Sequence, residues 1–139
     1  MANRFTKGKG LLGSIRTSGV VAANTSTKKA TVTTLTDATE TLTAAMVVTH
    51  GGLLVGTPTA TRAKTIPTGT LTCAALLGYA VGDTFEVNFI NLAGATYALT
   101  VTAATGATIV GSATVAAATS ATYRVRVSAT DTVVWYRVA

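Results

Sequence analysis

Residues 84–92 read TFEVNFINL and contain the clearest strand of the chain. Phe85, Val87 and Phe89 alternate with polar residues, so the apolar side chains share one face of an extended segment. Such alternation is typical of a strand that covers a core on one side and meets solvent on the other. The stretch therefore predicts a β-protein whose sheet is buried on one face.

Three later stretches repeat this alternation: 96–103 (TYALTVTA), 122–129 (TYRVRVSA) and 132–138 (TVVWYRV). In the second, Tyr123 and two valines face one side and two arginines face the other. A short turn at residues 129–131 separates the last two stretches. We therefore expect them to pair as a hairpin.

The rest of the chain supplies shorter strand-like segments, at 30–36 and 40–49, and a strand at 61–67 that ends at a proline. Residues 73–80 (CAALLGYA) are expected to form one or two turns of helix. Short strands at near-regular spacing, separated by glycine turns, predict an all-β fold, a single β-sandwich of jelly-roll type. An SH3-like or OB-type barrel is the alternative.

We expect two parts in the chain. Residues 1–50 are predicted to be an extended N-terminal arm with a strand-like end, and residues 51–139 a β-sandwich domain. The boundary is placed where Gly51-Gly52 and the run 56–59 (GTPT) punctuate the sequence. At 139 residues the chain has room for one compact domain with an extension.

The formal net charge of +6 belongs to the first 29 residues, and the remainder carries five basic and five acidic residues. No acidic residue precedes Asp37. A basic, glycine-rich arm on a neutral body predicts a binding element attached to a module. The predicted partner-binding residues are the six basic side chains of the arm: Arg4, Lys7, Lys9, Arg16, Lys28 and Lys29.

Two alternatives to protein docking are open for the arm. It can be a solvated tail that only raises solubility, or it can neutralise the phosphates of a nucleic acid. Six charges over 29 residues are sparse, and Phe5 is the only aromatic residue among them, so base stacking is poorly served. Nucleic acid is therefore the weaker partner, and docking onto a protein surface is favoured.

The composition also points to an assembly. Hydrophobic residues make up 48% of the chain and charged residues 12%, and threonine accounts for roughly a fifth, far above ordinary usage. Freely diffusing proteins usually carry more mixed surface charge, so this composition favours a protein that is packed into a larger assembly.

There is no apolar run of about 18 residues, so no membrane partner is expected.

The second half of the chain resembles a known pattern in VGDTFEVNFIN (81–91), YALTVTAATGATIVGSATVAAATSATYRVRV (97–127) and the closing VVWYRV (133–138). Over roughly residues 62–138 it is similar to the C-terminal β-domain of small structural proteins of tailed phages, which decorate or cement capsids or form head fibres. The resemblance implies a virion protein on the outer capsid surface. Its partners would be the major capsid protein and further copies of itself, as a homotrimer or a dimer. A head-fibre or host-glycan-binding module is the alternative.

Nothing in the sequence assembles a catalytic or metal centre, and we expect no enzyme activity, metal or cofactor. His50 has no nearby cysteine or carboxylate, and Cys73, the single cysteine, is expected to be buried rather than reactive. Asp83 and Glu86 fall on opposite faces of a strand, which makes them a poor acid–base pair. Asp83 is instead expected to stabilise a turn.

The outward charges near the C-terminus predict an inter-subunit contact. If 122–127 and 133–138 pair, Arg124, Arg126 and Arg137 are expected to share one sheet face with Tyr136. Their alternative role is to form a solvated outer face. Of Trp135 and Tyr136, one should enter the core and the other should face outward.

Overall fold

The computed structural model describes residues 29–139. Most of the regular structure in this range is β-strand, with one short α-helix and one π-helical turn, so the all-β class is confirmed. The strands are β1 (Val32–Thr34), β2 (Glu40–Thr41), β3 (Leu53–Gly56), β4 (Arg62–Thr65), β5 (Thr84–Asn91), β6 (Leu99–Thr102), β7 (Ala107–Val110), β8 (Thr114–Val115), β9 (Thr119–Ala129) and β10 (Thr132–Arg137). The helices are η2 (Ala45–Thr49) and α4 (Gly69–Ala75).

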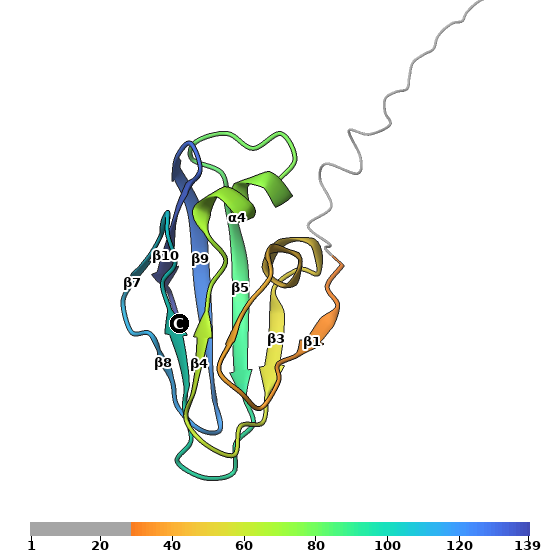
Figure 1. The fold of residues 1–139 in the computed structure, drawn as a ribbon, viewed down its shortest axis with the longest axis vertical. Coiled ribbons are helices and arrows are strands. Elements are labelled where there is room, and N and C mark those ends of the chain that lie inside the picture. The colour runs from red at the N-terminus through yellow and green to blue at the C-terminus, as the bar shows by residue number, and fades with distance from the viewer. Residues whose placement is uncertain (1–28) are drawn as a thin grey trace, which may run out of the picture.

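The strands form two sheets, shown in Figure 1. One has six strands in the order β1-β3-β5-β9-β10-β7, and the other has four in the order β2-β4-β6-β8. From β1 to β9, successive strands alternate between the two sheets. Almost every connection therefore passes from one sheet to the other. Both sheets contribute side chains to one continuous hydrophobic core.

This alternation explains the direction of the strands. A chain that leaves a sheet, adds a strand to the other sheet and returns will run in its original direction. Four strand pairs follow this rule and are parallel: β1/β3, β3/β5, β2/β4 and β4/β6. β7 and β10 are also parallel, although β10 follows β9 within the same sheet, and β6 and β8 depart from the rule because they pair antiparallel. Jelly rolls are built from antiparallel strands. The pairing observed here therefore differs from the jelly-roll order that the strand spacing had suggested.

The antiparallel centre of the larger sheet agrees with the sequence. β9 pairs with β5 over residues 119–126 and with β10 over residues 123–129, so the hairpin considered from the sequence is present and residues 123–126 pair on both sides. Asp131 closes the hairpin with a φ of 54°. The rings of Phe89 and Trp135 each lie 5.9 Å from that of Tyr123, edge to face. These three aromatic side chains are buried and form the middle of the core.

The boundary expected at Gly51 requires correction. β1 and β2 lie within residues 32–50 and pair with β3 and β4, and Leu35, Leu42 and Val47 belong to the core. This part of the expected arm is integral to the folded body. Its two strands have three and two residues, which is too short for alternation to reveal which face is buried.

Helix α4 begins earlier than predicted. It spans residues 69–75 instead of 73–80, because the Thr68 side chain accepts a hydrogen bond from the backbone N–H of Leu71 and caps the helix there. The helix packs closely on its neighbours. A Cβ atom built on Gly69 would lie 2.2 Å from the carbonyl oxygen of Asp131 and 2.3 Å from that of Gly106.

Gly69 therefore provides a test of the fold. The substitution Gly69→Ala should lower the free energy of unfolding by about 3 kcal/mol, because rigid backbone must move to admit the methyl group. Gly94→Ala is the matched control, since nothing lies within 4 Å of its added Cβ, and it should change stability by less than about 0.5 kcal/mol. Urea denaturation measures both, and equal stabilities of the two variants would contradict the close packing of α4.

Candidate functional site

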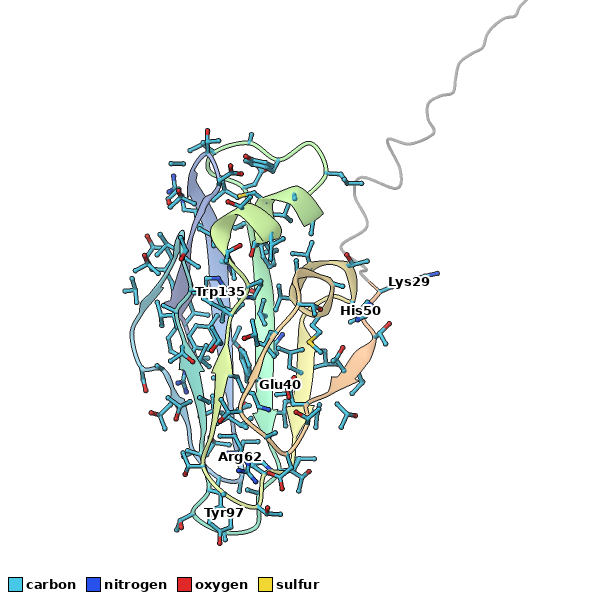
Figure 2. All side chains as sticks on the ribbon, in the orientation of Figure 1. Lys29, Glu40, His50, Arg62, Tyr97 and Trp135 are labelled. Carbon is cyan, nitrogen blue, oxygen red and sulfur yellow. The ribbon has the colours of Figure 1, made fainter. Side chains whose placement is uncertain are left out.

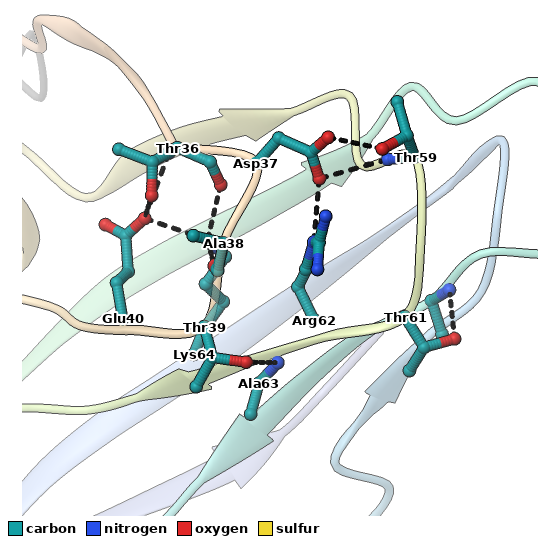
Figure 3. Close-up of polar contacts among 11 residues, drawn as sticks. Thr36, Asp37, Ala38, Thr39, Glu40, Thr59, Thr61, Arg62, Ala63 and Lys64 are labelled. Atoms are coloured by element: carbon teal, nitrogen blue, oxygen red, sulfur yellow. Dashed lines mark hydrogen bonds and ion pairs between the residues drawn. The ribbon is translucent and has the colours of Figure 1, made fainter.

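The most elaborate polar cluster is centred on Lys64, which is fully buried in β4. Its Nζ donates hydrogen bonds to the carbonyl oxygens of Thr36 and Ala38, both at 2.7 Å, and to Oε1 of Glu40 at 2.9 Å. Glu40 also accepts hydrogen bonds from the backbone N–H and hydroxyl of Thr36. Figure 3 shows these groups converging on the ammonium, and we call them the Lys64 network.

A second ion pair lies beside this network. Nε of Arg62 is 2.8 Å from Oδ1 of Asp37, and the same carboxylate accepts hydrogen bonds from the backbone N–H and hydroxyl of Thr59. The hydrogen bond from Arg62, supported by those from Thr59, holds the pKa of Asp37 far below its usual range. Together the two clusters fasten the β1–β2 connection to β4 and to the β3–β4 connection.

The Lys64 network holds structure rather than performing chemistry. All three ammonium protons of Lys64 have acceptors, so the amine presents no lone pair for nucleophilic attack. Burial alone would raise the pKa of Glu40, but hydrogen bonds from Thr36 and Lys64 outweigh burial and lower it. Glu40 is therefore ionised at neutral pH and is unsuited to act as a general acid there.

The groups that the sequence raised as catalytic candidates occupy structural positions. His50 ends η2, and its carbonyl accepts a hydrogen bond from the Thr31 N–H at 2.7 Å. Cys73 is buried, which raises the pKa of its thiol. Asp83 accepts a hydrogen bond from the Ala80 N–H at 2.8 Å, so its predicted turn role is confirmed. Within residues 29–139, no three acidic, histidine or cysteine side chains gather as metal ligands.

The expected common face of the three arginines needs correction. Arg124 and Arg126 point outward from β9, and Arg124 pairs with Glu86 of β5 at 2.8 Å. In the hairpin register Arg137 lies opposite Tyr123, an inward-facing residue. Its guanidinium is 5.9 Å from the centre of the Tyr123 ring and donates hydrogen bonds to the Ser112 and Thr114 carbonyls. Arg137 thus fastens the β7–β8 connection.

Tyr136 does share the outer face with Arg124, its partner in the hairpin register, while Trp135 enters the core. The prediction that these adjacent aromatic residues face opposite ways is therefore confirmed. Tyr136 also lies opposite Val110 of the edge strand β7, and both side chains are exposed. No partner chain is present, so the role of this face as an inter-subunit contact stays a prediction.

Among the predicted partner-binding residues, Lys29 alone lies in the described range. Arg4, Lys7, Lys9, Arg16 and Lys28 fall outside the described residues. Lys29 is exposed and lies beside the turn at His50, as Figure 2 shows. Thr31 is bonded to that turn, and a Cβ on Gly51 would lie 2.8 Å from Cβ of Ala30. The position at which the arm joins the body is therefore fixed.

A cavity of about 490 Å³ opens at this junction. Its size falls within the range of ligand-binding pockets. The strands and helices around it contribute both apolar walls and a polar margin, and we call it the arm-root cavity. Its principal lining residues are Val47, Val48, Leu76 and Phe85, with Lys29 and Glu86.

Apolar side chains are also exposed on α4 and on the connection from α4 to β5. Leu77 is 94% exposed, and Leu71 and Val81 are each more than half exposed. Their neighbour Leu76 lines the arm-root cavity, so this apolar surface lies close to the base of the arm. Alternation of apolar and polar residues marks strands and does not extend into a seven-residue helix, so this surface could not be found from that pattern. The adjacent leucines at 76–77 were the available clue.

Comparison of the chain with protein-family models, with curated proteins and with solved structures found no match. In the range 29–139 no helix is both long and apolar enough to cross a membrane. The site is thus characterised by its own geometry: a neutral body with internally paired charges, and an apolar surface beside the root of a basic arm.

Removing Lys64 tests the importance of its network. Lys64→Met leaves the Glu40 carboxylate and two carbonyls without their donor, and should lower the free energy of unfolding by about 3 kcal/mol. Adding Glu40→Gln should restore part of the loss, since the uncompensated charge is gone. Arg126→Met, at an exposed position, should change stability by less than about 0.5 kcal/mol. A loss in Lys64→Met no greater than that in Arg126→Met would show the network to be dispensable.

Acid should weaken the same region. Folding lowers the pKa of both Asp37 and Glu40 relative to the unfolded chain, where carboxyl groups titrate near pH 4. Their stabilisation is therefore complete above about pH 5 and is lost as the pH falls toward the folded pKa values. The urea midpoint should fall steeply below about pH 4.5. The Asp37→Asn/Glu40→Gln double variant should show a shallower fall, and an unchanged slope would assign the acid sensitivity to other groups.

Proposed function

We propose that this protein is a non-enzymatic structural component of a virion: a decoration or cement protein that binds the outer surface of a tailed-phage capsid. The observation that carries the proposal is the separation of charge and apolar exposure. The body beyond residue 29 is neutral, whereas six basic residues precede residue 30, and Lys29 lines a cavity together with Leu76, the neighbour of exposed Leu77. One region thus combines a basic arm with an apolar contact surface.

These two elements suit a protein lattice. The apolar side chains of the α4 region would be buried against a capsid subunit, while the arm would lie along the surface and pair with carboxylates or carbonyl oxygens. The partner would be the major capsid protein. Burial at the α4 surface contributes affinity, and the arm extends the contact across the boundary between neighbouring subunits.

The rest of the body supports a structural role. Three carboxylates out of five form ion pairs inside the body, with Arg62, Lys64 and Arg124, and Asp83 stabilises a turn. Few charged side chains of the described body therefore remain available to take part in a reaction. We infer a β-sandwich wound by alternating crossovers, with the outer face of β9 and β10 available for contact with further copies as a homotrimer or a dimer.

Binding of this kind would stabilise the mature shell by linkage. A ligand that binds the assembled, expanded lattice and not its precursors lowers the free energy of that lattice. Each oligomer would present several arms and several apolar surfaces. Contacts that are individually weak then combine through a high effective concentration, provided that the spacing of sites on the shell lets them engage together.

A head-fibre or host-glycan-binding module is the second candidate. The observation in its favour is Tyr97, which is 39% exposed on the β5–β6 connection, at the opposite end of the body from α4. An exposed aromatic ring at this end of the body is suited to stack against a sugar that approaches from outside the particle. Tyr97→Ala should then reduce adsorption to host cells and leave capsid occupancy unchanged.

Deletion of the arm tests the principal proposal. A chain lacking residues 1–28 should bind undecorated mature capsids at least about tenfold more weakly, equivalent to about 1.4 kcal/mol, because the arm contacts are lost. Co-sedimentation with purified capsids measures the occupancy. Undiminished occupancy would remove the arm from the docking mechanism.

The α4 surface can be tested independently. Leu71→Ser with Leu77→Ser removes exposed apolar area without touching the core and should also weaken capsid binding several-fold. Val138→Ser, another exposed apolar position, is the control and should bind normally. Equal capsid binding by the two variants would show that the contact with the capsid lies elsewhere than on the α4 surface.

A further inference from the structure

The arm-root cavity has walls that the body alone leaves uncovered. Val48, Leu76 and Phe85 are only partly buried although they pack against the core, and all three line the cavity. Apolar walls around a volume of about 490 Å³ suit aliphatic side chains. Glu86 and Asn88 stand at the margin. Glu86 already pairs with Arg124 and Asn88 accepts a hydrogen bond from Thr122, and their remaining lone pairs can accept from a basic or amide group.

The arm carries side chains of the required kind. Residues 7–16 read KGKGLLGSIR, in which two adjacent leucines and an isoleucine are flanked by Lys9 and Arg16. Within residues 1–29 this segment holds the only leucines and the only isoleucine, and it has no acidic residue. Lys9 and Arg16, which flank the leucines and the isoleucine, would each be placed to pair with Glu86 at the margin of the cavity. Lys29 would not favour either of the two directions in which the segment can lie.

The tether decides between possible occupants. The chain is anchored at the cavity wall by Lys29 and Ala30, so the arm begins where the cavity opens. About 17 residues separate Leu12 from Lys29, and a flexible chain of that length has a root-mean-square span of roughly 20–25 Å. Such a short tether gives an effective concentration on the order of millimolar, well above that of a separate partner in dilute solution.

We propose that, in the free protein, the Leu11–Leu12 segment of the arm docks into the arm-root cavity of its own chain and is released when the arm binds the capsid. This inference rests on the proposed docking role of the arm. Docking in the cavity would hold the basic, apolar arm away from unrelated surfaces before the lattice is reached. The capsid would then compete with the cavity for the same segment.

Disulfide trapping in the full-length free protein tests the proposal without capsids. The pair Leu12→Cys and Leu76→Cys should form an intramolecular disulfide under mild oxidation, detected by mass spectrometry of the monomer fraction. The control pair, Leu12→Cys with Leu77→Cys, places the second thiol one residue away and 94% exposed, outside the cavity. Bonding in the Leu76 pair should be at least about fivefold faster, since docking raises the local thiol concentration. Equal rates, or mainly intermolecular disulfides, would overturn it.

Tryptic cleavage after Arg16 gives a second readout that does not alter the body. Leu11→Asp with Leu12→Asp should increase the cleavage rate several-fold by releasing the arm, whereas Ala22→Asp with Ala23→Asp, which adds the same charge away from the Arg16–Thr17 bond, should not match that increase. An equal increase in both variants would contradict docking. Because neither experiment includes capsids, the inference can fail while arm deletion still abolishes capsid binding, and the reverse outcome is equally visible.

Discussion

The packing around Tyr123 is the interaction on which most of the structure depends. Its ring contacts Phe89 of β5 and Trp135 of β10 edge to face, so one residue of β9 joins three neighbouring strands. Its hydroxyl donates to the Ser112 carbonyl at 2.8 Å, which brings in the β7–β8 connection. Arg137 lies over the same ring and bonds the same connection. Aromatic packing and polar anchoring therefore meet at a single position of the core.

The N-terminal strands depend on a different constraint. β1 and β2 are too short to be stable through pairing alone, and their connection carries the carbonyls of Thr36 and Ala38 toward the interior. Lys64 satisfies both carbonyls and Glu40 at once. A fully buried ammonium is costly unless every proton has a partner, so the network specifies a single conformation for this connection. The body thus begins near residue 30, with the arm attached at a fixed position.

This organisation relates the proposed function to the fold. The body directs most of its charges inward or into pairs, and the exposed Leu71 and Leu77 lie on or next to α4, beside Leu76 of the arm-root cavity. A fixed attachment point for the arm beside exposed apolar side chains gives such a protein a well-defined means of adhering. Adhesion by an arm and an adjacent surface is reversible at each contact and strong in combination, which suits addition to a shell that has already assembled.

Alternation in the sequence was enough to predict the β class, the strands at 84–92, 122–129 and 132–138, the turn that joins the last two, the inward direction of Tyr123, and the opposite directions of Trp135 and Tyr136. These features follow from alternation over six or more residues, which is local information. Other features are visible in the folded chain alone: strands alternate between sheets and several pairs run parallel, residues 32–50 belong to the body, and Arg137 faces inward. Parallel pairing joins segments far apart in the chain. Its partners are chosen by core packing and by buried groups such as Lys64, neither of which leaves a periodic trace in the sequence.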